Sequence, residues 1–297
     1  MPEHPAASIR ELAVRSEGVT LAVWEGPDNG PTVLLVHGFP DTHVVWDPVV
    51  DRLLPRFHCV TYDVRGAGAS DRPGTRDSYV ARRLVTDLVA VMNAFSPGRP
   101  VHLVGPDWGS IQAWEAVVRE GSDSRLTGRI ASYTTISGPC LDHFGRWARG
   151  AIRGTRHDKR AALEQALRSW YVLAFQVPVL PELLLRHLNR VTPRRRRGAV
   201  RGHFAETLPE DAAYGANLYR ANRRGRQPVA GGRRTTVPVQ LIVPTRDKYL
   251  TPAIYEGLDG YALDLARVEL DAGHWVQLSH PDEVADLIAT FALAHES

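Results

Sequence analysis

Short, uninterrupted apolar runs recur along this chain and alternate with segments of helical period. Runs such as TVLLV at 32–36 and HCVTY at 58–62 are typical of strands buried on both faces of a parallel sheet. The same signal is present at 100–104, 130–136, 239–243 and 266–270, and a partly alternating run covers 16–25. Helices are predicted at 80–95, 109–120 and 281–294. This alternation predicts an α/β fold with a mostly parallel central sheet flanked by helices.

The strand signals stop after about residue 137 and resume at Val237. Between these points the sequence becomes helical, arginine-rich and aromatic, as in RWARGAIRG and ALEQALRSWYVLAFQ. A stretch of this length is an insertion into the sheet rather than a simple connection between two strands. We therefore predict a core made of residues 1–137 and 237–297 and an inserted helical cap, or lid, made of residues 138–236.

Composition excludes several classes of protein. Hydrophobic residues make up 43% of the chain and charged residues 23%, which is typical of a globular protein and not of a disordered one. The two cysteines, Cys59 and Cys140, lack metal-ligand spacing, so we expect no metal site and a reducing, cytoplasmic setting. No apolar run is long enough to cross a membrane, and the N-terminal residues do not resemble a signal peptide, so we expect a protein that is neither secreted nor membrane-spanning and has no membrane partner.

The net charge of +3 and the pI near 9.0 raise the question of a nucleic-acid partner. Arginines concentrate in the run from Arg194 to Arg197 and in a second basic stretch between about 220 and 234. No aromatic-rich RNA-binding signature, basic zipper or zinc-finger spacing accompanies them. We interpret both clusters as solvated surface and expect no nucleic-acid partner.

The stretch VHLVGPDWGS at 101–110 has the form of a nucleophile elbow. Asp107 stands between a buried strand and a helix, with Gly105 and Gly109 at the positions where a sharp, strained turn requires small residues. The chain contains no Gly-x-Ser-x-Gly, so the nucleophile would be a carboxylate. A carboxylate that attacks a saturated carbon forms an alkyl ester, which points to an epoxide or an alkyl halide as the electrophile. The alternative is that Asp107 caps a helix and Trp108 packs in the core.

An acid and a histidine follow two later strands. Asp247 comes after the strand at 239–243, and His274 comes after the strand at 266–270. The chain order of nucleophile, acid and histidine is the order of an α/β-hydrolase. We predict that His274 activates a water and that Asp247 orients the imidazole, with Asp271 as the weaker alternative to Asp247.

The segment HGFP follows the buried strand at 32–36. This position predicts that the backbone N–H of Phe39 lies beside the elbow, where it would form an oxyanion hole with the N–H of Trp108. An ordinary loop is the alternative for this segment. The glycine-rich stretch at 62–71 lacks the spacing of a phosphate loop or a dinucleotide fingerprint, so we interpret it as structural and expect no cofactor.

Several of these segments together resemble the epoxide hydrolases of the α/β-hydrolase superfamily. The resemblance covers essentially the whole length and rests on HGFPDTHVVWDPVV, YDVRGAGASDRP, GPDWGS, TRDKYLTP and AGHW, in that order. The chain looks most similar to the hydrolase half of bacterial proteins that carry a short-chain dehydrogenase behind it, and we expect no dehydrogenase activity of residues 1–297. One departure is Pro106, where the family commonly has His. We expect this position to take no part in the work of the nucleophile, so the change should not abolish it.

The resemblance also implies two cap tyrosines that hydrogen-bond the epoxide oxygen. RSWYVLAFQVP matches the first segment and gives Tyr171, and GANLYRAN matches the second and gives Tyr219. Phenols with a pKa of ~10 can donate to an oxygen that becomes an alkoxide without being ionised at neutral pH. The alternative is that both tyrosines only pack inside the cap.

The predicted function is hydrolysis of an epoxide to a vicinal diol through an ester on Asp107. One alternative is a haloalkane dehalogenase, in which Asp107 is again the nucleophile and the indole N–H of Trp108 points at the halide. The other is a non-catalytic binding protein. Aromatic residues in the cap favour a small apolar substrate, and the residues expected to bind it are Phe39, Trp108, Trp170 and Phe175. The aromatics Trp147, Trp170, Phe175 and Phe204 could equally join cap to core. Both a monomer and a homodimer stay open.

Overall fold

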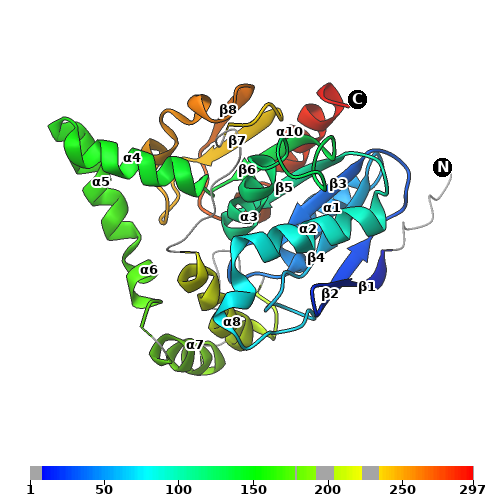
Figure 1. Ribbon diagram of the computed structural model, residues 1–297, viewed down its shortest axis with the longest axis horizontal. Coiled ribbons are helices and arrows are strands. Elements are labelled where there is room, and N and C mark those ends of the chain that lie inside the picture. The colour runs from blue at the N-terminus through cyan, green and yellow to red at the C-terminus, as the bar shows by residue number, and fades with distance from the viewer. Residues whose placement is uncertain (1–8, 178, 192–203, 223–233, 297) are drawn as a thin grey trace.

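The computed structural model of the protein describes residues 9–177, 179–191, 204–222 and 234–296. In these residues one sheet has the strand order β1-β2-β4-β3-β5-β6-β7-β8 (Figure 1). The strands are β1 (Arg10–Ser16), β2 (Val19–Glu25), β3 (Thr32–Val36), β4 (His58–Tyr62), β5 (Val101–Pro106), β6 (Ile130–Ile136), β7 (Val239–Pro244) and β8 (Leu265–Leu270). Pairing is antiparallel from β1 to β2 and from β2 to β4, and parallel in all the other pairs. The predicted α/β fold with a mostly parallel sheet is therefore confirmed.

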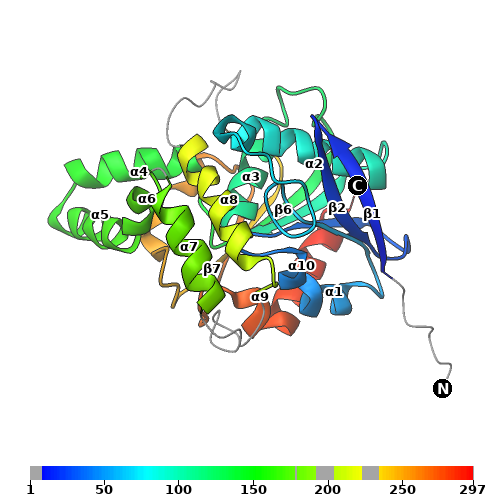
Figure 2. The same ribbon diagram turned by 90° about the horizontal axis from the view of Figure 1, so that it is seen from below.

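Helices cover both faces of the sheet. Figure 2 shows α2 (Ala81–Phe95) and α3 (Asp107–Val117) on one side, and α1 (Asp47–Leu53), α9 (Val276–Ser279) and α10 (Pro281–Ala294) on the other. The run TVLLV divides its side chains between two apolar clusters: Leu34 and Val36 face α2 and α3, while Val33 and Leu35 face α1 and α10. Because both faces are buried, a central strand has no polar side, and its sequence reads as continuously apolar.

The strand predicted over 16–25 is present as β2, but its predicted beginning is wrong. This stretch contains the end of β1, a turn at Glu17 and Gly18, and the whole of β2, and the two strands form a hairpin. Both turn residues have positive φ, 40° at Glu17 and 80° at Gly18. Burial alternates only at the end of β1, where Val14 and Ser16 are buried, and β2 has no exposed residue, so periodicity alone did not locate the reversal.

Between β6 and β7 the described residues form five inserted α-helices. They are α4 (Leu141–Arg153), α5 (Arg156–Arg168), α6 (Trp170–Ala174), α7 (Leu180–Val191) and α8 (Leu208–Ala221). We call residues 141–221 the insertion; in Figure 1 its helices extend to one side of the sheet and below it. The arginine run from Arg194 to Arg197, which we interpreted as solvated surface, lies outside the described residues. None of the described helices combines the length and the apolar character needed to span a membrane.

Arg220, the first residue of the second basic stretch, is buried, with only 9% of its surface exposed. Its guanidinium donates to the carbonyl oxygens of Phe175 and Val177, at 2.5 and 2.6 Å, and forms an ion pair with Glu182. The interpretation of Arg220 as solvated is therefore wrong. A charge count could not reveal this, because the partners are backbone and side-chain atoms more than 35 positions away. Arg220 fastens α8 to the segment that joins α6 to α7.

Candidate active site

Asp107 lies at a tight turn between β5 and α3. Its φ is 47°, a conformation that most L-residues avoid. A Cβ atom added to Gly109 would lie 2.2 Å from the carbonyl oxygen of Val36, and one added to Gly105 would lie 2.5 Å from the carbonyl carbon of Gly109. Only glycine fits at these two positions, and this strained turn points the Asp107 carboxylate away from the sheet.

Two backbone amides hold the Asp107 carboxylate. The N–H of Phe39 donates to Oδ1 at 2.8 Å, and the N–H of Trp108 also bonds to the carboxylate. Burial raises the pKa of Asp107 to about 6, although the charge of His274 and these two amides favour the ionised form. The structure thus brings both predicted oxyanion-hole amides to the predicted nucleophile.

His274 lies between two carboxylates. Its Nδ1 is 2.8 Å from Oδ2 of Asp247, and its Nε2 is 3.8 Å from Oδ2 of Asp107. Burial alone would lower the pKa of His274, but the charge and hydrogen bond of Asp247 and the charge of Asp107 outweigh burial and raise the pKa above its ordinary value. Nδ1–H therefore donates to Asp247, and Nε2 faces the nucleophile.

The Asp247 carboxylate is held by its own turn. Oδ1 accepts the backbone N–H groups of Tyr249 and Leu250, at 2.7 and 3.2 Å. Burial would raise the pKa of Asp247, yet His274 and these amides hold it below its ordinary value, so the group stays ionised. The alternative acid, Asp271, pairs at 2.8 Å with Arg246, and its side chain is 81% exposed. Asp247, and not Asp271, contacts the histidine.

A cavity of about 190 Å³ lies above Asp107. It is lined by Phe39, Pro40, Asp107, Tyr171, Phe175, Tyr219, Tyr249, His274 and Trp275. The rings of Tyr171 and Tyr219, from α6 and α8, lie 5.8 Å apart edge to face. Burial, and after it the charge of Asp107, raises the pKa of both phenols, so both keep their protons. In the described part of the chain, no three His, Cys, Asp or Glu side chains converge to hold a metal ion.

Not every predicted substrate-binding residue lies at this cavity. Phe39 and Phe175 line it, whereas Trp108 is not a lining residue and packs, buried, edge to face on Tyr219 at 5.0 Å. Trp170 does not line it, because its side chain is 67% exposed. Successive residues of a helix point about 100° apart, so the turn that aims Tyr171 and Phe175 inward leaves Trp170 outside. The assignment of Trp170 to the substrate site is corrected accordingly.

The aromatics Tyr249 and Trp275 line the cavity, and sequence reasoning missed both. Their rings lie 4.8 and 4.9 Å from the ring of His274, and the indole N–H of Trp275 donates to Asp41 at 3.0 Å. A signal existed in the sequence, since each aromatic stands one or two positions after a predicted catalytic residue at a strand end. The imidazole therefore packs against two aromatic rings, which also contact each other at 5.9 Å, and is hydrogen-bonded to Asp247.

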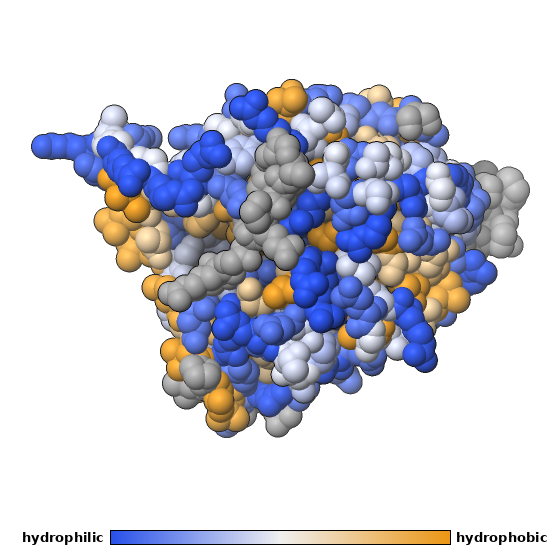
Figure 3. Space-filling view, in the orientation of Figure 1, coloured by the Kyte–Doolittle hydropathy of each residue, from blue (hydrophilic) through white to orange (hydrophobic). Residues whose placement is uncertain are grey.

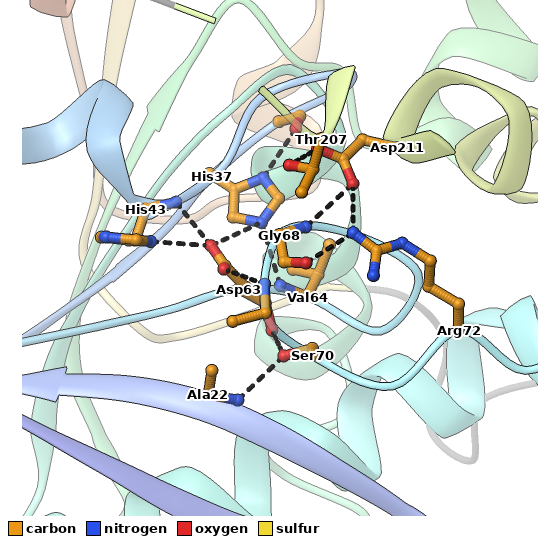
Figure 4. Close-up of polar contacts among 12 residues, drawn as sticks. Ala22, His37, His43, Asp63, Val64, Gly68, Ser70, Arg72, Thr207 and Asp211 are labelled. Carbon is orange, nitrogen blue, oxygen red and sulfur yellow. Dashed lines mark hydrogen bonds and ion pairs between the residues drawn. The ribbon is translucent and has the colours of Figure 1, made fainter. Parts of the chain in front are cut away.

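The glycine-rich loop at 62–71 is hydrogen-bonded to His37, two residues before Phe39 (Figure 4). The Nδ1–H of His37 donates to the carbonyl of Gly38 at 2.8 Å, and its Nε2 accepts the N–H of Val64 at 2.9 Å. Asp63 accepts the N–H of His43 and the N–H of Ala69, each at 2.8 Å. These bonds give the loop the structural role predicted for it.

The same loop fastens helix α8. Asp211 of α8 is 2% exposed and accepts the N–H of Gly68 at 2.9 Å, a guanidinium N–H of Arg72 at 2.8 Å and the hydroxyl of Thr207 at 2.6 Å (Figure 4). Asp211 lies two turns before Tyr219 on the same helix. A buried carboxylate with three donors therefore sets the position of the helix that carries one of the two phenols.

Comparisons with known proteins place this chain in a family. The family model described as alpha/beta hydrolase fold matches residues 31–281. The probable oxidoreductase EphD of Mycobacterium tuberculosis is 40% identical over 293 residues, which cover 93% of this chain and 48% of that protein. This chain thus spans about half the length of that relative. Epoxide hydrolase A of the same organism is 28% identical over 335 residues, covering 95% of this chain and 96% of that protein.

Solved structures show the same architecture. The crystal structure of the Bacillus megaterium epoxide hydrolase in complex with an inhibitor superimposes with a TM-score of 0.76 at 22% sequence identity, covering 94% of this chain and 99% of that one. At 22% identity this similarity shows only that the fold is shared. The family of the chain is shown by the family model, which matches most of the sequence. The protein belongs to the α/β hydrolase fold family.

Proposed function

We propose that this chain is an epoxide hydrolase that converts a small apolar epoxide into a vicinal diol. One observation carries the proposal: the Asp107 carboxylate shares a 190 Å³ aromatic cavity with two protonated phenols, Tyr171 and Tyr219. A carboxylate nucleophile paired with two neutral donors suits a reaction in which a carbon–oxygen bond opens and its oxygen gains charge. The similarity to Epoxide hydrolase A supports the same assignment.

The first step forms an ester. A carboxylate oxygen of Asp107 attacks one ring carbon of the epoxide, and the bond between that carbon and the ring oxygen breaks. The electron pair of the broken bond goes to the oxygen, which takes a proton from Tyr171 or Tyr219. The product is a hydroxyalkyl ester of Asp107, and the aromatic cavity wall excludes competing water during the step.

The second step cleaves the ester. His274 takes a proton from water, and the resulting hydroxide attacks the carbonyl carbon of the Asp107 ester. The tetrahedral oxyanion accepts hydrogen bonds from the N–H groups of Phe39 and Trp108. When it collapses, the diol leaves with the oxygen that Asp107 supplied, and the carboxylate is regenerated. Asp247 stabilises the imidazolium, which returns its proton to the phenolate.

The insertion acts in this proposal as a cap, and the cap and core boundaries are the predicted 138–236 around 1–137 and 237–297. Support comes from the cavity, since Tyr171, Phe175 and Tyr219 of the insertion form one wall and Asp107 and His274 of the core form the other. We also propose a cytoplasmic setting, because Cys59 and Cys140 are free, buried thiols. We propose no nucleic-acid partner, because Arg220 at the start of the second basic stretch is buried and paired with Glu182.

The test is turnover of a panel of aromatic and aliphatic epoxides by the purified chain, with the diol measured by mass spectrometry. We expect diol from at least one small aromatic epoxide. Haloalkanes run in parallel test the dehalogenase alternative, and we expect no halide release because the cavity presents phenols where a leaving halide needs N–H donors. Halide release without diol formation would replace the proposal with that alternative, and ligand retention without any product would favour a binding protein.

The dependence of kcat/KM and kcat on pH should reveal the roles of the Asp107 and Asp247 carboxylates. Asp107 attacks as the ionised form, so we expect kcat/KM to rise with pH through about 6, the pKa of that group. His274 works as the neutral base, so we expect kcat to fall at acid pH when ester hydrolysis limits the rate, and the charge and hydrogen bond of Asp247, which raise the pKa of His274, set where this acid limb lies. Asp247→Asn removes the charge that stabilises the imidazolium, so this limb should move to lower pH. Stopped-flow rates across pH measure both limbs, and an unmoved limb in Asp247→Asn contradicts the role of Asp247.

A further inference from the structure

Exposed apolar side chains concentrate on one part of the insertion. Of the thirteen large apolar side chains that are exposed among the described residues, nine lie between residues 152 and 184. Six of them form what we call the apolar strip, with exposed fractions from 49% to 68%: Leu163, Leu167, Trp170, Leu173, Leu183 and Leu184. Figure 3 shows orange residues along the margin of the molecule where Figure 1 places α5, α6 and α7. An exposed apolar surface of this kind marks an interaction site.

The residues that precede the strip on α5 are basic. Arg156, Lys159 and Arg160 are exposed and lie on the same helical face as Leu163 and Leu167, since positions three and four apart along a helix share a face. Figure 3 shows this end of the insertion, where α4 meets α5, as hydrophilic. One face of α5 is therefore cationic in its first half and apolar in its second half.

The acidic groups of α5 do not neutralise this face. Asp158 accepts hydrogen bonds from the backbone N–H and the hydroxyl of Thr155, at 2.7 and 2.8 Å, and caps the helix. Glu164 pairs with Arg168 at 2.6 Å. The positive charge at the head of the strip is thus available to a partner.

We propose that the apolar strip and the basic residues before it dock the protein on an anionic lipid surface. Apolar side chains beside exposed cations are the pattern of a helix that lies in a bilayer interface, where the side chains enter the acyl boundary and the cations contact anionic headgroups. Trp170 suits this position, because tryptophan favours the interface between headgroups and acyl chains. A second copy of the chain fits less well, since the leucine and tryptophan side chains of the strip offer no acidic group to pair with the basic residues of the other copy.

The docking surface adjoins the candidate active site through α6. Tyr171 and Phe175 point from this helix into the cavity, while Trp170 and Leu173 are exposed on its outer side. An apolar epoxide dissolved in the bilayer would therefore be one helix away from Asp107. This consequence rests on the proposed epoxide hydrolase function, whereas the docking itself does not.

Vesicle binding tests the docking. Asp107→Asn protein is mixed with vesicles of phosphatidylglycerol and phosphatidylcholine, or of phosphatidylcholine alone, and the bound fraction is measured by flotation at low and high salt. We expect binding to the anionic vesicles that weakens with salt. The triple variant Leu163→Ser, Leu167→Ser, Leu173→Ser and the triple variant Arg156→Gln, Lys159→Gln, Arg160→Gln should each lower the partition coefficient about tenfold or more. Because binding needs no turnover, its failure is distinct from a failure of the proposed function.

The matched control is Leu12→Ser with Leu263→Ser, two leucines of the core that are 39% and 62% exposed, which should leave binding unchanged. Sedimentation velocity measures self-association of the same proteins. The proposal is overturned if Asp107→Asn protein with an intact docking surface does not bind anionic vesicles. It is also overturned if the serine and glutamine triple variants bind as strongly as that protein. A dimer that the serine variant dissociates would instead assign the strip to a second copy.

Discussion

Asp107→Asn is expected to lower kcat by a factor on the order of 10⁴ or more, because it removes the nucleophile on which both steps depend. The substitution keeps the size of the side chain and its acceptor for the N–H of Phe39. A single turnover of unsubstituted protein in oxygen-18 water gives the direct measurement. The heavy oxygen should appear in Asp107, and the first diol should carry only unlabelled oxygen, since water attacks the ester carbonyl.

The control for this variant is its stability. The folded protein raises the pKa of Asp107 from 3.8 to about 6, so the stability that this group contributes is present below pH 3.8 and is lost as the pH rises through 6. At neutral pH the buried carboxylate therefore destabilises the fold, and a neutral asparagine should raise the free energy of unfolding by roughly 1–3 kcal/mol. Urea unfolding at pH 7 measures this gain. A variant that is both more stable and inactive excludes misfolding as the cause of the lost activity.

The opposite labelling pattern would contradict the covalent route. If the first diol contains heavy oxygen and Asp107 contains none, water has attacked the epoxide directly and Asp107 acts only as a base. Retained turnover in Asp107→Ala, which cannot revert to a carboxylate by deamidation, would remove the residue from the mechanism altogether.

His274→Gln should separate the two steps. Without the imidazole the ester of Asp107 still forms, but no base activates the water, so hydrolysis should slow by a factor on the order of 10³. Mass spectrometry of the intact protein should then show an adduct with the mass of one epoxide, and peptide mapping should place it on Asp107. The expected kinetic signature is a burst of one epoxide consumed per protein molecule, followed by almost no turnover.

The control here is His157→Gln, a substitution at a histidine whose side chain is 84% exposed on the insertion, which should turn over at the normal rate. Normal steady-state turnover of His274→Gln would show that another group is the base. A folded His274→Gln that forms no adduct would mean that the imidazolium charge is needed to ionise Asp107, since the two groups are 3.8 Å apart.

Local sequence pattern was sufficient to predict the parallel strands of the sheet and the positions of Asp107 and His274 at its edge, but not the hairpin of β1 and β2. The runs at 32–36, 58–62 and 130–136 coincide with β3, β4 and β6, because a strand buried on both faces has to be apolar throughout. Gly105 and Gly109 marked the elbow because no other residue fits beside that turn. Strand ends at one edge of a parallel sheet meet in space, which is why chain order favoured Asp247 as the partner of His274; the structure decided between Asp247 and Asp271.

Only the tertiary structure decided which cap and loop side chains reach the cavity. Trp170 and Tyr171 are adjacent in sequence, yet one is exposed and the other lines the cavity, because the packing of α6 sets its rotation about the helix axis. The bond from Gly68 to Asp211 joins residues 143 positions apart, and no periodicity within either segment encodes it. Short-range pattern reports burial and turns, whereas the aim of a side chain on an inserted helix depends on contacts between distant segments, which form only when the whole chain folds.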